Sequence, residues 1–467
     1  MNQPLKDTAD SCAAVIKKHS EVRIVSHIDA DGLTAAAIMS RALERSGIEH
    51  STTFVKQLDR GTLERVADLN IPTIFTDLGS GMLSEMPAGI DIVIADHHQI
   101  DQRDVGCDLQ VRHLNPHLFG IDGSTELSGA GCAYIVAQSL GRDAGTNADL
   151  ADLAIVGAVG DLQARRSGKL VGCNREILKR GRDCGVIEYK KDLSLFGKQT
   201  RQVFRLLQYS SDPYLPGITG NESASIEFLK RAGINFRGEQ WKRWIDLSED
   251  EKQKVVSMLV QHCITKKMSS YNIHRLITEV YVLAREQEGT EMRDASEYAT
   301  LLNATARYGF ADVGLAVCIG DREMELTRAR ELLVNHRKNL VNGLKFVREE
   351  GITELHHIQY FDAGSSIKDT IVGIVAGMSL TNTRNRKMPI FAFAESDDGL
   401  KVSARGTQGL IRQGLNLADA LKACAAKVEG MGGGHNIAAG ATIPMGAKDE
   451  FLELIDAMVG EQLAVKA

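Results

Sequence analysis

The chain lacks any apolar run long enough to cross a membrane, and its first ten residues are polar, unlike a signal peptide. Its eight cysteines are scattered over 467 residues, and none belongs to a Cys-x-x-Cys pair. The sequence therefore predicts neither a zinc ribbon nor a dithiol redox motif. Scattered cysteines are typical of proteins in a reducing compartment. We expect a cytoplasmic protein without a membrane partner.

The chain also lacks a strong net charge. The formal value is −6 at pH 7, which provides no overall attraction to nucleic acid. Nucleic-acid binding would then depend on local basic surfaces. Three short clusters are candidates, although each alone is typical of a solvated loop: Arg165-Arg166-Lys169, Lys266-Lys267 and Arg384-Arg386-Lys387. The length allows two to four domains with a large core.

One stretch near the N-terminus combines a strand pattern with potential metal ligands. β-Branched residues at 22–25 predict a short buried strand. His27, Asp29 and Asp31 follow at alternate positions, and an Ala-rich helix is expected over 33–46. The three ligands would then lie on a loop at the carboxyl end of a strand, where open α/β sheets bind their ligands. Asp and Gly are also ordinary turn residues, so this stretch alone leaves a structural turn as an equal alternative.

Strand and helix patterns alternate through the first part of the chain, which favours a parallel, doubly wound α/β sheet. The expected strands are rich in Val and Ile, and they cover 51–55, 71–76, 91–95 and 111–114. Polar residues follow three of them: Asp77, Asp96-His97-His98 and Asn115. An apolar segment over 151–160, read as a buried helix, leads to Asp161. Because parallel strands end at one edge, we expect these side chains to converge there.

A cluster of carboxylates and imidazoles needs a compensating cation, because the acids repel one another. Without cysteine ligands, Mn²⁺ or Mg²⁺ is favoured over Zn²⁺. Six or more ligands are too many for one catalytic ion and suit two ions about 4 Å apart, bridged by a carboxylate. Such a pair of ions hydrolyses phosphate esters or anhydrides.

The rest of the chain divides into two further parts. A turn-rich stretch over 212–220 marks a break, and the pattern is then helical, with a capping box at Ser248–Glu251 and a long helix over 322–350. After residue 345 the patterns of strand and helix mix again. We therefore expect three domains, covering 1–195, 196–345 and 346–467.

The last domain carries one feature with chemistry. Gly432, Gly433 and Gly434 are expected to form a loop whose backbone amides can hold an anion, and His435 adds a donor. Ser403 and Arg405 could supply a hydroxyl and a guanidinium fork for phosphate. A flexible loop is the alternative explanation of the glycine run.

Four motifs in this order resemble those of the DHH phosphoesterase superfamily: His27-x-Asp29-x-Asp31-Gly32, Asp77, Asp96-His97-His98 and Gly157-Ala158-Val159-Gly160-Asp161. The resemblance implies that His27 and Asp29 hold one ion and that Asp31, His97 and Asp161 hold the other, with Asp77 bridging. It also implies that His98 contacts the scissile phosphate or assists proton transfer, while Asp96 orients the two histidines.

The C-terminal part resembles the DHHA1 substrate-binding domain through residues 373–377, Ser403-x-Arg405 and the segment from Gly432 to His435. In that arrangement the DHH and DHHA1 domains face each other across a groove. The resemblance implies that Ser403, Arg405, the three glycines and His435 bind the substrate.

Stretches such as LFGKQTRQVF and EYATLLNATARYG resemble the archaeal RecJ-like proteins, in particular the GINS-associated nucleases. This resemblance implies a 5′→3′ single-stranded DNA exonuclease that uses Mn²⁺ or Mg²⁺ and docks through its middle domain onto the GINS complex in replication or repair.

Three alternatives stay open. They are a 3′→5′ nuclease that works with a repair helicase, a phosphodiesterase for short oligonucleotides or cyclic dinucleotides, and a binding module of the replication machinery. The choice between DNA and RNA is also open.

Overall fold

A computed structural model describes residues 3–100, 111–143, 145–210, 212–237, 240–382 and 385–464. Arg384, from one of the basic clusters, lies outside these ranges. The chain divides into two compact units, Met1–Leu333 and Val334–Ala467. No helix in the described part of the chain is both long and apolar enough to cross a membrane.

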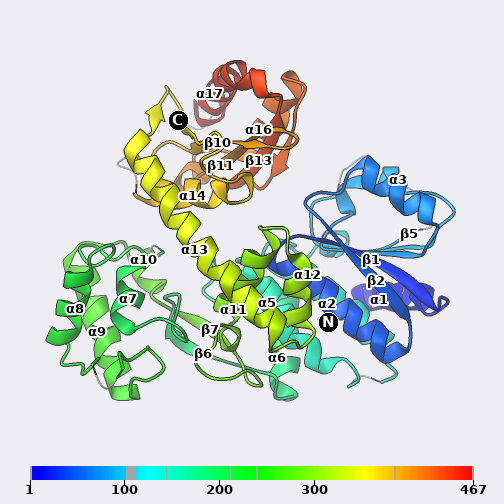
Figure 1. Ribbon diagram of the computed structural model, residues 1–467, viewed down its shortest axis with the longest axis horizontal. Coiled ribbons are helices and arrows are strands. Elements are labelled where there is room, and N and C mark those ends of the chain that lie inside the picture. The colour runs from blue at the N-terminus through cyan, green and yellow to red at the C-terminus, as the bar shows by residue number, and fades with distance from the viewer. Residues whose placement is uncertain are drawn as a thin grey trace. The chain divides into compact units, whose positions relative to one another are not determined.

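The first unit is built around a five-stranded sheet in the order β2-β1-β3-β4-β5, and every neighbouring pair is parallel. Figure 1 labels its strands β1, β2 and β5. The strands are β1 (Glu21–His27), β2 (Glu49–Val55), β3 (Thr73–Thr76), β4 (Ile92–Ala95) and β5 (Val111–Leu114). This confirms the doubly wound sheet that the alternating patterns predicted. All five carboxyl ends lie along one edge.

Helices cover both faces of this sheet. Successive residues of a strand point to opposite faces, so the neighbours Ile24 and Val25 of β1 pack in different cores. Ile24 packs with α1 (Gln3–Ile16), α2 (Ala30–Ser46) and α4 (Gly129–Leu140) in the main core. Val25 packs in a second core with α3 (Arg60–Leu69) and the short helix η1 (Ser80–Glu85). The predicted apolar helix is α5 (Ala151–Gly160), which packs on α2 and α4. Helix α6 (Gly172–Asp183) packs on α5.

An antiparallel ribbon of β6 (Ile187–Leu193) and β7 (Ile277–Leu283) follows, at positions where the sequence pattern indicated no strand. Between the two strands the described residues form four helices with a core of their own around the buried Trp244: α7 (Val203–Gln208), α8 (Glu222–Arg231), α9 (Glu249–Thr265) and α10 (Ser270–His274). The predicted capping box is confirmed, because Ser248 and Glu251 exchange hydrogen bonds at the start of α9.

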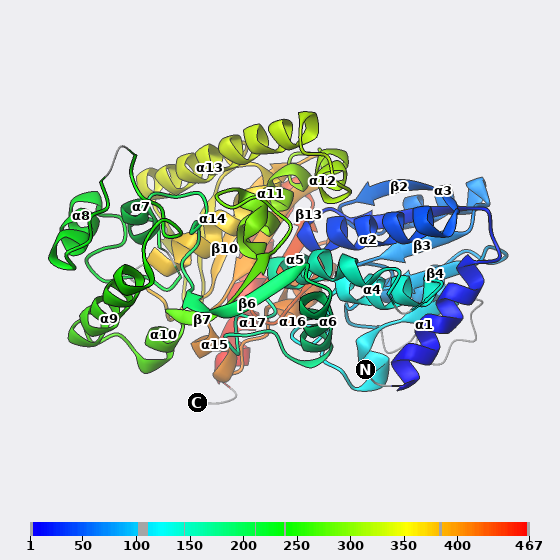
Figure 2. The ribbon, with the colours of Figure 1, turned by 90° about the horizontal axis from the view of Figure 1, so that it is seen from below.

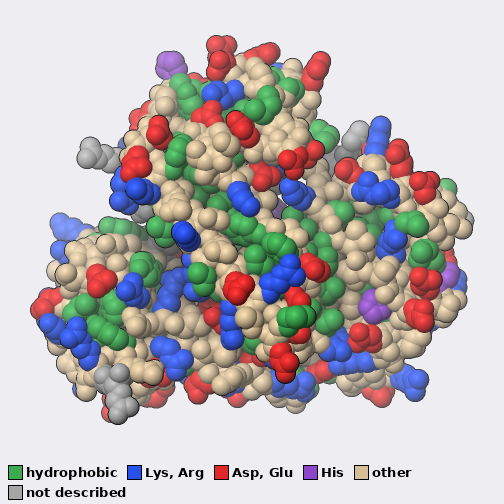
Figure 3. Space-filling model, viewed as in Figure 1, with side chains coloured by type: hydrophobic (Ala, Val, Ile, Leu, Met, Phe, Trp, Pro, Cys, Tyr) green, Lys and Arg blue, Asp and Glu red, His purple; other side chains and the backbone are tan. Residues whose placement is uncertain are grey.

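Beyond β7 the chain returns to the main core. Helices α11 (Ala295–Ala306) and α12 (Ala311–Cys318) pack against α2, and α11 also packs against α5 (Figure 2). The long helix α13 (Met324–Glu350) then continues into the second unit, as the pattern over 322–350 indicated. On the face shown in Figure 3, the Lys and Arg side chains are mixed with Asp and Glu, in keeping with the small net charge.

The second unit contains a mixed six-stranded sheet in the order β12-β13-β11-β10-β9-β8. Its strands are β8 (Thr353–Glu354), β9 (Gln359–Asp362), β10 (Ile390–Ser396), β11 (Gly399–Arg405), β12 (Met431–Gly434) and β13 (Ala438–Ile443). Helix α14 (Asp369–Asn382) packs on β10 and β11, whereas α16 (Leu417–Lys427) and α17 (Lys448–Ala464) share a separate core with the sheet. A short helix, α15 (Gln408–Arg412), follows β11.

One expectation for this unit is wrong. Gly432, Gly433 and Gly434 do not form a loop. They belong to β12, an edge strand that pairs antiparallel with β13. A Cβ atom on Gly432 would lie 2.7 Å from the backbone oxygen of Leu421, so the close approach of α16 requires glycine there. Gly432 thus allows the strand and α16 to pack closely, and the glycine run is a paired strand rather than a flexible loop.

Candidate metal centre

The first three candidate ligands follow one another where β1 passes into α2. His27 is the last residue of β1, and Asp29 is the N-cap of α2, where its Oδ1 accepts a hydrogen bond from the Gly32 amide at 2.9 Å. Helix α2 begins at Ala30, three residues earlier than expected. Asp31 therefore lies in the first turn of a helix, and the expectation that it lies on a loop is wrong.

The other candidates come from the ends of neighbouring elements. Asp77 directly follows β3 and has a positive φ of 59°. Asp96, His97 and His98 directly follow β4, and Asp161 is the C-cap of α5. The structure brings these residues together with those of β1, as the parallel sheet implied.

Candidate ligand atoms lie within 4.8 Å of one another in three groups. The groups are His27, Asp29 and Asp77; Asp31, His97 and Asp161; and Asp77, His97 and His98. Asp77 and His97 each belong to two groups. A position shared in this way is where a bridging ligand would lie between two ions.

The N-terminus of α4 holds Asp31 in place. The backbone amides of Gly129 and Ala130 donate to the two oxygens of its carboxylate at 2.7 and 3.0 Å. Two glycines make the close packing possible here. A Cβ on Gly129 would lie 2.4 Å from Oδ1 of Asp77, and one on Gly157 would lie 2.3 Å from Oδ1 of Asp31. The glycine before Ala158 in the fourth motif therefore makes room for a candidate ligand.

The histidine pair is oriented by groups outside the cluster. Nδ1 of His97 lies 2.7 Å from the Gly123 carbonyl, which fixes this nitrogen as the donor and leaves Nε2 facing the carboxylates, 3.2 Å from Asp77. Asp96 is fully buried, and its Oδ1 accepts from Nδ1 of His98 at 2.7 Å and from the His97 amide at 2.7 Å. His98 is 42% exposed, so it can reach a bound molecule while Asp96 holds it.

The cluster is electrostatically unfavourable without a cation. Burial and the charge of Asp77 raise the pKa of Asp31 well above its usual range. Burial also raises the pKa of Asp161. Burial lowers the pKa of His27, but Asp29 and Asp77 outweigh it and raise the pKa well above the usual range. Protons therefore take the place that a divalent cation would fill.

Unsatisfied atoms support the same conclusion. Among the described side chains, the buried atoms Oδ1 of Asp77 and Nδ1 of His27 have no hydrogen-bond partner. Buried polar atoms are almost always paired, so such atoms in a cluster of acids need another ligand. Carboxylate oxygens and imidazole nitrogens are donors that Mn²⁺ accepts readily, and Mg²⁺ accepts the oxygens. The residues present fit a divalent metal ion.

Two residues near the centre were not identified from the sequence. Oδ1 of Asn303, on α11, accepts a hydrogen bond from the Ala30 amide at 3.1 Å. Burial raises the pKa of Asp29, but the charge and hydrogen bond of His27 outweigh burial and lower it, and Arg307, just beyond α11, adds a smaller lowering. The spacing of four residues places both on one side of a helix, and this spacing was a signal that could have found them.

In the second unit, the predicted substrate residues lie at one end of the sheet. Arg405 on β11 pairs with Ala438 on β13, and the His435 amide donates to the Ala438 carbonyl at 2.9 Å. Gly373 on α14 lies directly against Arg405 and Ser403, because a Cβ there would meet Nη2 of Arg405 at 2.5 Å and Oγ of Ser403 at 3.1 Å. The strand β12 ends at Gly434, next to His435. Arg405 and His435 thus flank the same residue.

Three family descriptions match the chain. The N-terminal domain of the DHH family matches residues 21–158, the DHH-CID domain matches 195–277, and the DHHA1 domain matches 356–461. An uncharacterized protein of Methanocaldococcus jannaschii is 30% identical over 454 residues, which cover 96% of this chain and 95% of that protein. The chain belongs to the DHH family. Its fold is RecJ-like.

Among solved structures, RecJ of Thermus thermophilus in complex with Mn²⁺ superposes on this DHH-family chain with a TM-score of 0.61 and 18% identity, covering 98% of this chain and 55% of RecJ. CDC45 of Entamoeba histolytica gives a TM-score of 0.66 at 13% identity, covering 98% of this chain and 99% of CDC45. The T. thermophilus RecJ sequence is 26% identical over 193 residues, which are 28% of its length. The chain thus spans about half of the RecJ structure.

Proposed function

We propose that this protein is a metal-dependent exonuclease that removes mononucleotides from single-stranded DNA in the 5′→3′ direction by two-metal phosphodiester hydrolysis. RNA is the alternative substrate. The two ions would be Mn²⁺ or Mg²⁺. Structures of RecJ, which shares this fold, contain Mn²⁺ or Mg²⁺, and the proposal extends that property to this chain.

The shared position of Asp77 is the observation that carries the proposal. Asp77 is buried, has one carboxylate oxygen without a hydrogen bond, and belongs to two groups of candidate ligands. We assign His27 and Asp29 to one ion and Asp31, His97 and Asp161 to the other, with Asp77 bridging. When bound, two such ions supply Lewis acidity and lower the pKa of a water molecule.

The protein side chains would orient the substrate and stabilise charge. His98 is held by Asp96 and partly exposed, so it would donate a hydrogen bond to the scissile phosphate. Asp96 acts through His98 and His97 rather than on the substrate. In the second unit, Ser403, Arg405 and His435 would hold the terminal phosphate, and Gly432, Gly433 and Gly434 of the edge strand β12 would lie beside it. The guanidinium of Arg405 is suited to two parallel hydrogen bonds with phosphate.

The partner of the middle region is also part of this proposal. We propose three domains, 1–195, 196–345 and 346–467, with the GINS complex docking on the middle one. The small core around Trp244 supports a distinct module between β6 and β7. A repair helicase is the alternative partner and would accompany a 3′→5′ polarity.

A binding role without catalysis is the second candidate. It is favoured by the similarity to CDC45, which extends over nearly the whole of both chains. The complete set of candidate ligands argues against it, because a scaffold has no need to keep several buried acids together at a cost in stability. A phosphodiesterase for short oligonucleotides or cyclic dinucleotides would use the same ligands and differ only in substrate.

The deciding experiment uses two substrates, a long single-stranded DNA labelled at either end and, in parallel, a dinucleotide, with Mn²⁺ and three proteins. These are wild type, Asp77→Asn and the control Asp68→Asn, which changes an exposed acid on α3 of the same unit. We expect stepwise release of the 5′ label by wild type and the control, and none by Asp77→Asn. Release from the 3′ end would instead support the repair-helicase branch. Cleavage of a dinucleotide alone would support a small-substrate enzyme, and no cleavage of either substrate would support the binding role.

A further inference from the structure

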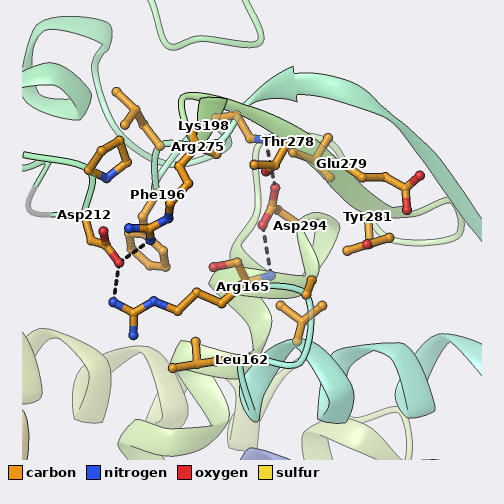
Figure 4. A pocket seen from close by; sticks show the side chains of 17 residues that line it. Leu162, Arg165, Phe196, Lys198, Asp212, Arg275, Thr278, Glu279, Tyr281 and Asp294 are labelled. Atoms are coloured by element: carbon orange, nitrogen blue, oxygen red, sulfur yellow. Dashed lines mark hydrogen bonds and ion pairs between the residues drawn. The ribbon is translucent and has the colours of Figure 1, made fainter. Parts of the chain in front are cut away.

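A cavity of about 180 Å³ lies beside the segment that carries Asp161 (Figure 4). Val159 and Leu162, which flank Asp161 in the chain, form part of its wall, and Phe196 and Pro213 add further apolar surface. Consecutive Cα atoms are 3.8 Å apart, so the cavity begins about one residue away from a candidate metal ligand. All of its lining residues belong to the first unit.

One side of the cavity carries a net positive charge. Arg165 and Arg275 each donate a hydrogen bond to Oδ2 of Asp212 at 2.6 Å. Two guanidinium groups on one carboxylate leave one positive charge in excess and several N–H donors for another acceptor. Arg165 is 54% exposed, so a phosphate can approach this side from solvent.

The other side has the opposite balance. Lys198 is 5% exposed, and its ammonium lies 3.8 Å from Asp192 and 3.7 Å from Asp294, beyond hydrogen-bond distance of either carboxylate. Among the described residues its Nζ has no hydrogen-bond partner. One cation between two acids gives a net negative charge. This side repels a phosphate but offers both donors and acceptors to a neutral polar group.

We propose that this cavity binds one nucleobase of the single-stranded substrate, with Arg165 and Arg275 holding an adjoining phosphate. A base is flat and apolar on its faces and carries donors and acceptors on its edge, so it matches apolar walls that end at Lys198 and Asp294. Sites for drug-sized ligands start at about 300 Å³, so this smaller cavity takes a single ring system rather than a whole nucleotide. The inference rests on the proposed nuclease function for its substrate class.

The test measures binding of a fluorescent twelve-nucleotide DNA strand to the full chain in EDTA, so that no strand is cleaved. Strands with a single abasic site at each position in turn are compared with the intact strand. Stacking and edge contacts at one base predict that one abasic position weakens binding about tenfold, while the others change it little. If every abasic strand binds as tightly as the intact one, the cavity does not hold a base.

A cavity-filling variant links this base to the cavity. Ser296 is exposed and lines the cavity from α11, so Ser296→Phe should weaken binding of the intact strand about tenfold and remove the dependence on abasic position. Thr300→Phe, one turn further along α11 and outside the lining, is the matched control and should behave as wild type. Unchanged binding by Ser296→Phe would overturn the proposal.

Arg165→Ala separates phosphate from base contacts and does not touch the core. It should lower affinity for all strands equally and reduce the slope of log Kd against log salt by about 0.7, while the abasic position that matters stays the same. An unchanged slope would contradict the phosphate contact.

Metal-dependent cleavage is measured separately. If wild type cleaves the strand and Ser296→Phe binds it as tightly as wild type does, the cavity assignment alone is refuted. Absence of strand cleavage would refute the nuclease assignment instead.

Discussion

The backbone amide of Ala30 donates a hydrogen bond to Oδ1 of Asn303 at 3.1 Å, across 273 positions of the chain. Ala30 lies between Asp29 and Asp31, two candidate ligands, so Asn303 fixes the backbone that presents both. Helix α11 also receives a contact near its other end, where Glu297 accepts a hydrogen bond from the Gln199 amide at 2.8 Å. One helix thus joins the metal centre to the segment that leads into the middle region.

Removing the acceptor at Asn303 should weaken metal binding without unfolding the protein. Groups that orient metal ligands typically contribute 10- to 100-fold in affinity or activity, and we expect a loss of about that size for Asn303→Ala. Mn²⁺ affinity by calorimetry and cleavage rates at saturating Mn²⁺ are the measurements. Thr300→Ala, on the same helix, is the control. Equal Mn²⁺ affinity in both variants would show that the Ala30 contact does not position the ligands.

Metal binding should stabilise the fold. Burial and mutual repulsion raise the pKa values of Asp31 and Asp161, and a cation removes that repulsion. At 100 times the dissociation constant, a ligand stabilises the folded state by about 2.7 kcal/mol per site. We expect Mn²⁺ to raise the melting temperature of wild type and Asp68→Asn, and EDTA to reverse this. Asp77→Asn should show little increase. A full increase in that variant would exclude Asp77 as a shared ligand.

Gly157 should not tolerate a side chain. A Cβ there would lie 2.3 Å from Oδ1 of Asp31 and 2.5 Å from the Cβ of Ala130, so α5 or the carboxylate must move. Overpacking of this kind costs about 1–3 kcal/mol, and we expect Gly157→Ala to lose both stability and Mn²⁺ affinity. Gly61→Ala is the control, because its nearest neighbour would be 3.7 Å away and alanine favours helix α3. Melting temperatures and Mn²⁺ titrations of both variants test whether Gly157→Ala alone loses stability and Mn²⁺ affinity.

Arg405 should act on substrate binding rather than on the metal ions. Arg405→Ala should raise KM at least tenfold with a smaller effect on kcat, because the lost contacts hold the phosphate in both ground and transition states. Arg405→Lys should restore little, since an ammonium cannot make the same paired hydrogen bonds. Lys422→Ala is the control, because Lys422 is exposed on α16, which packs in a different core from α14. A fall in kcat alone would place Arg405 in the chemical step.

Glu297 should make stability depend on pH. Burial raises its pKa from 4.5 to about 7, with Asp294 adding to the shift. A folded-state pKa above the unfolded value means that the folded protein binds an extra proton between these values. The contribution of Glu297 to the free energy of unfolding is therefore fully present below pH 4.5. It declines by about 3 kcal/mol as the pH rises to 7. Glu297→Gln, which keeps an acceptor for the Gln199 amide, should remove this decline.

Melting temperatures at pH 5 and pH 8 test this expectation. Wild type should lose more stability between the two values than Glu297→Gln does. Glu188→Gln, an exposed acid on β6, is the matched control and should follow wild type. If Glu297→Gln shows the same difference as wild type, Glu297 is already ionised at low pH in the folded protein.

The sequence alone determined the parallel sheet and the set of candidate ligands. Hydrophobic strands and the polar residues that follow them are local patterns, and parallel pairing then requires the strand ends to meet at one edge. His27, Asp77 and His97 could be grouped on this basis before any coordinates. The first residue of α2 could not be predicted correctly from the sequence. The capping hydrogen bond of Asp29 and the amides of α4 stabilise Asp31 inside the helix.

Other features were decided only by the tertiary structure, because they depend on residues distant in the chain. Gly432–Gly434 have low intrinsic preference for a strand, yet they pair with β13 at the sheet edge, and the close approach of α16 leaves no room for a side chain at Gly432. The ribbon of β6 and β7 joins segments about ninety residues apart and carries no strong local pattern. The contact of Asn303 with Ala30 and the cavity beside Leu162 likewise exist only after packing, which brings separate elements to within hydrogen-bond distance.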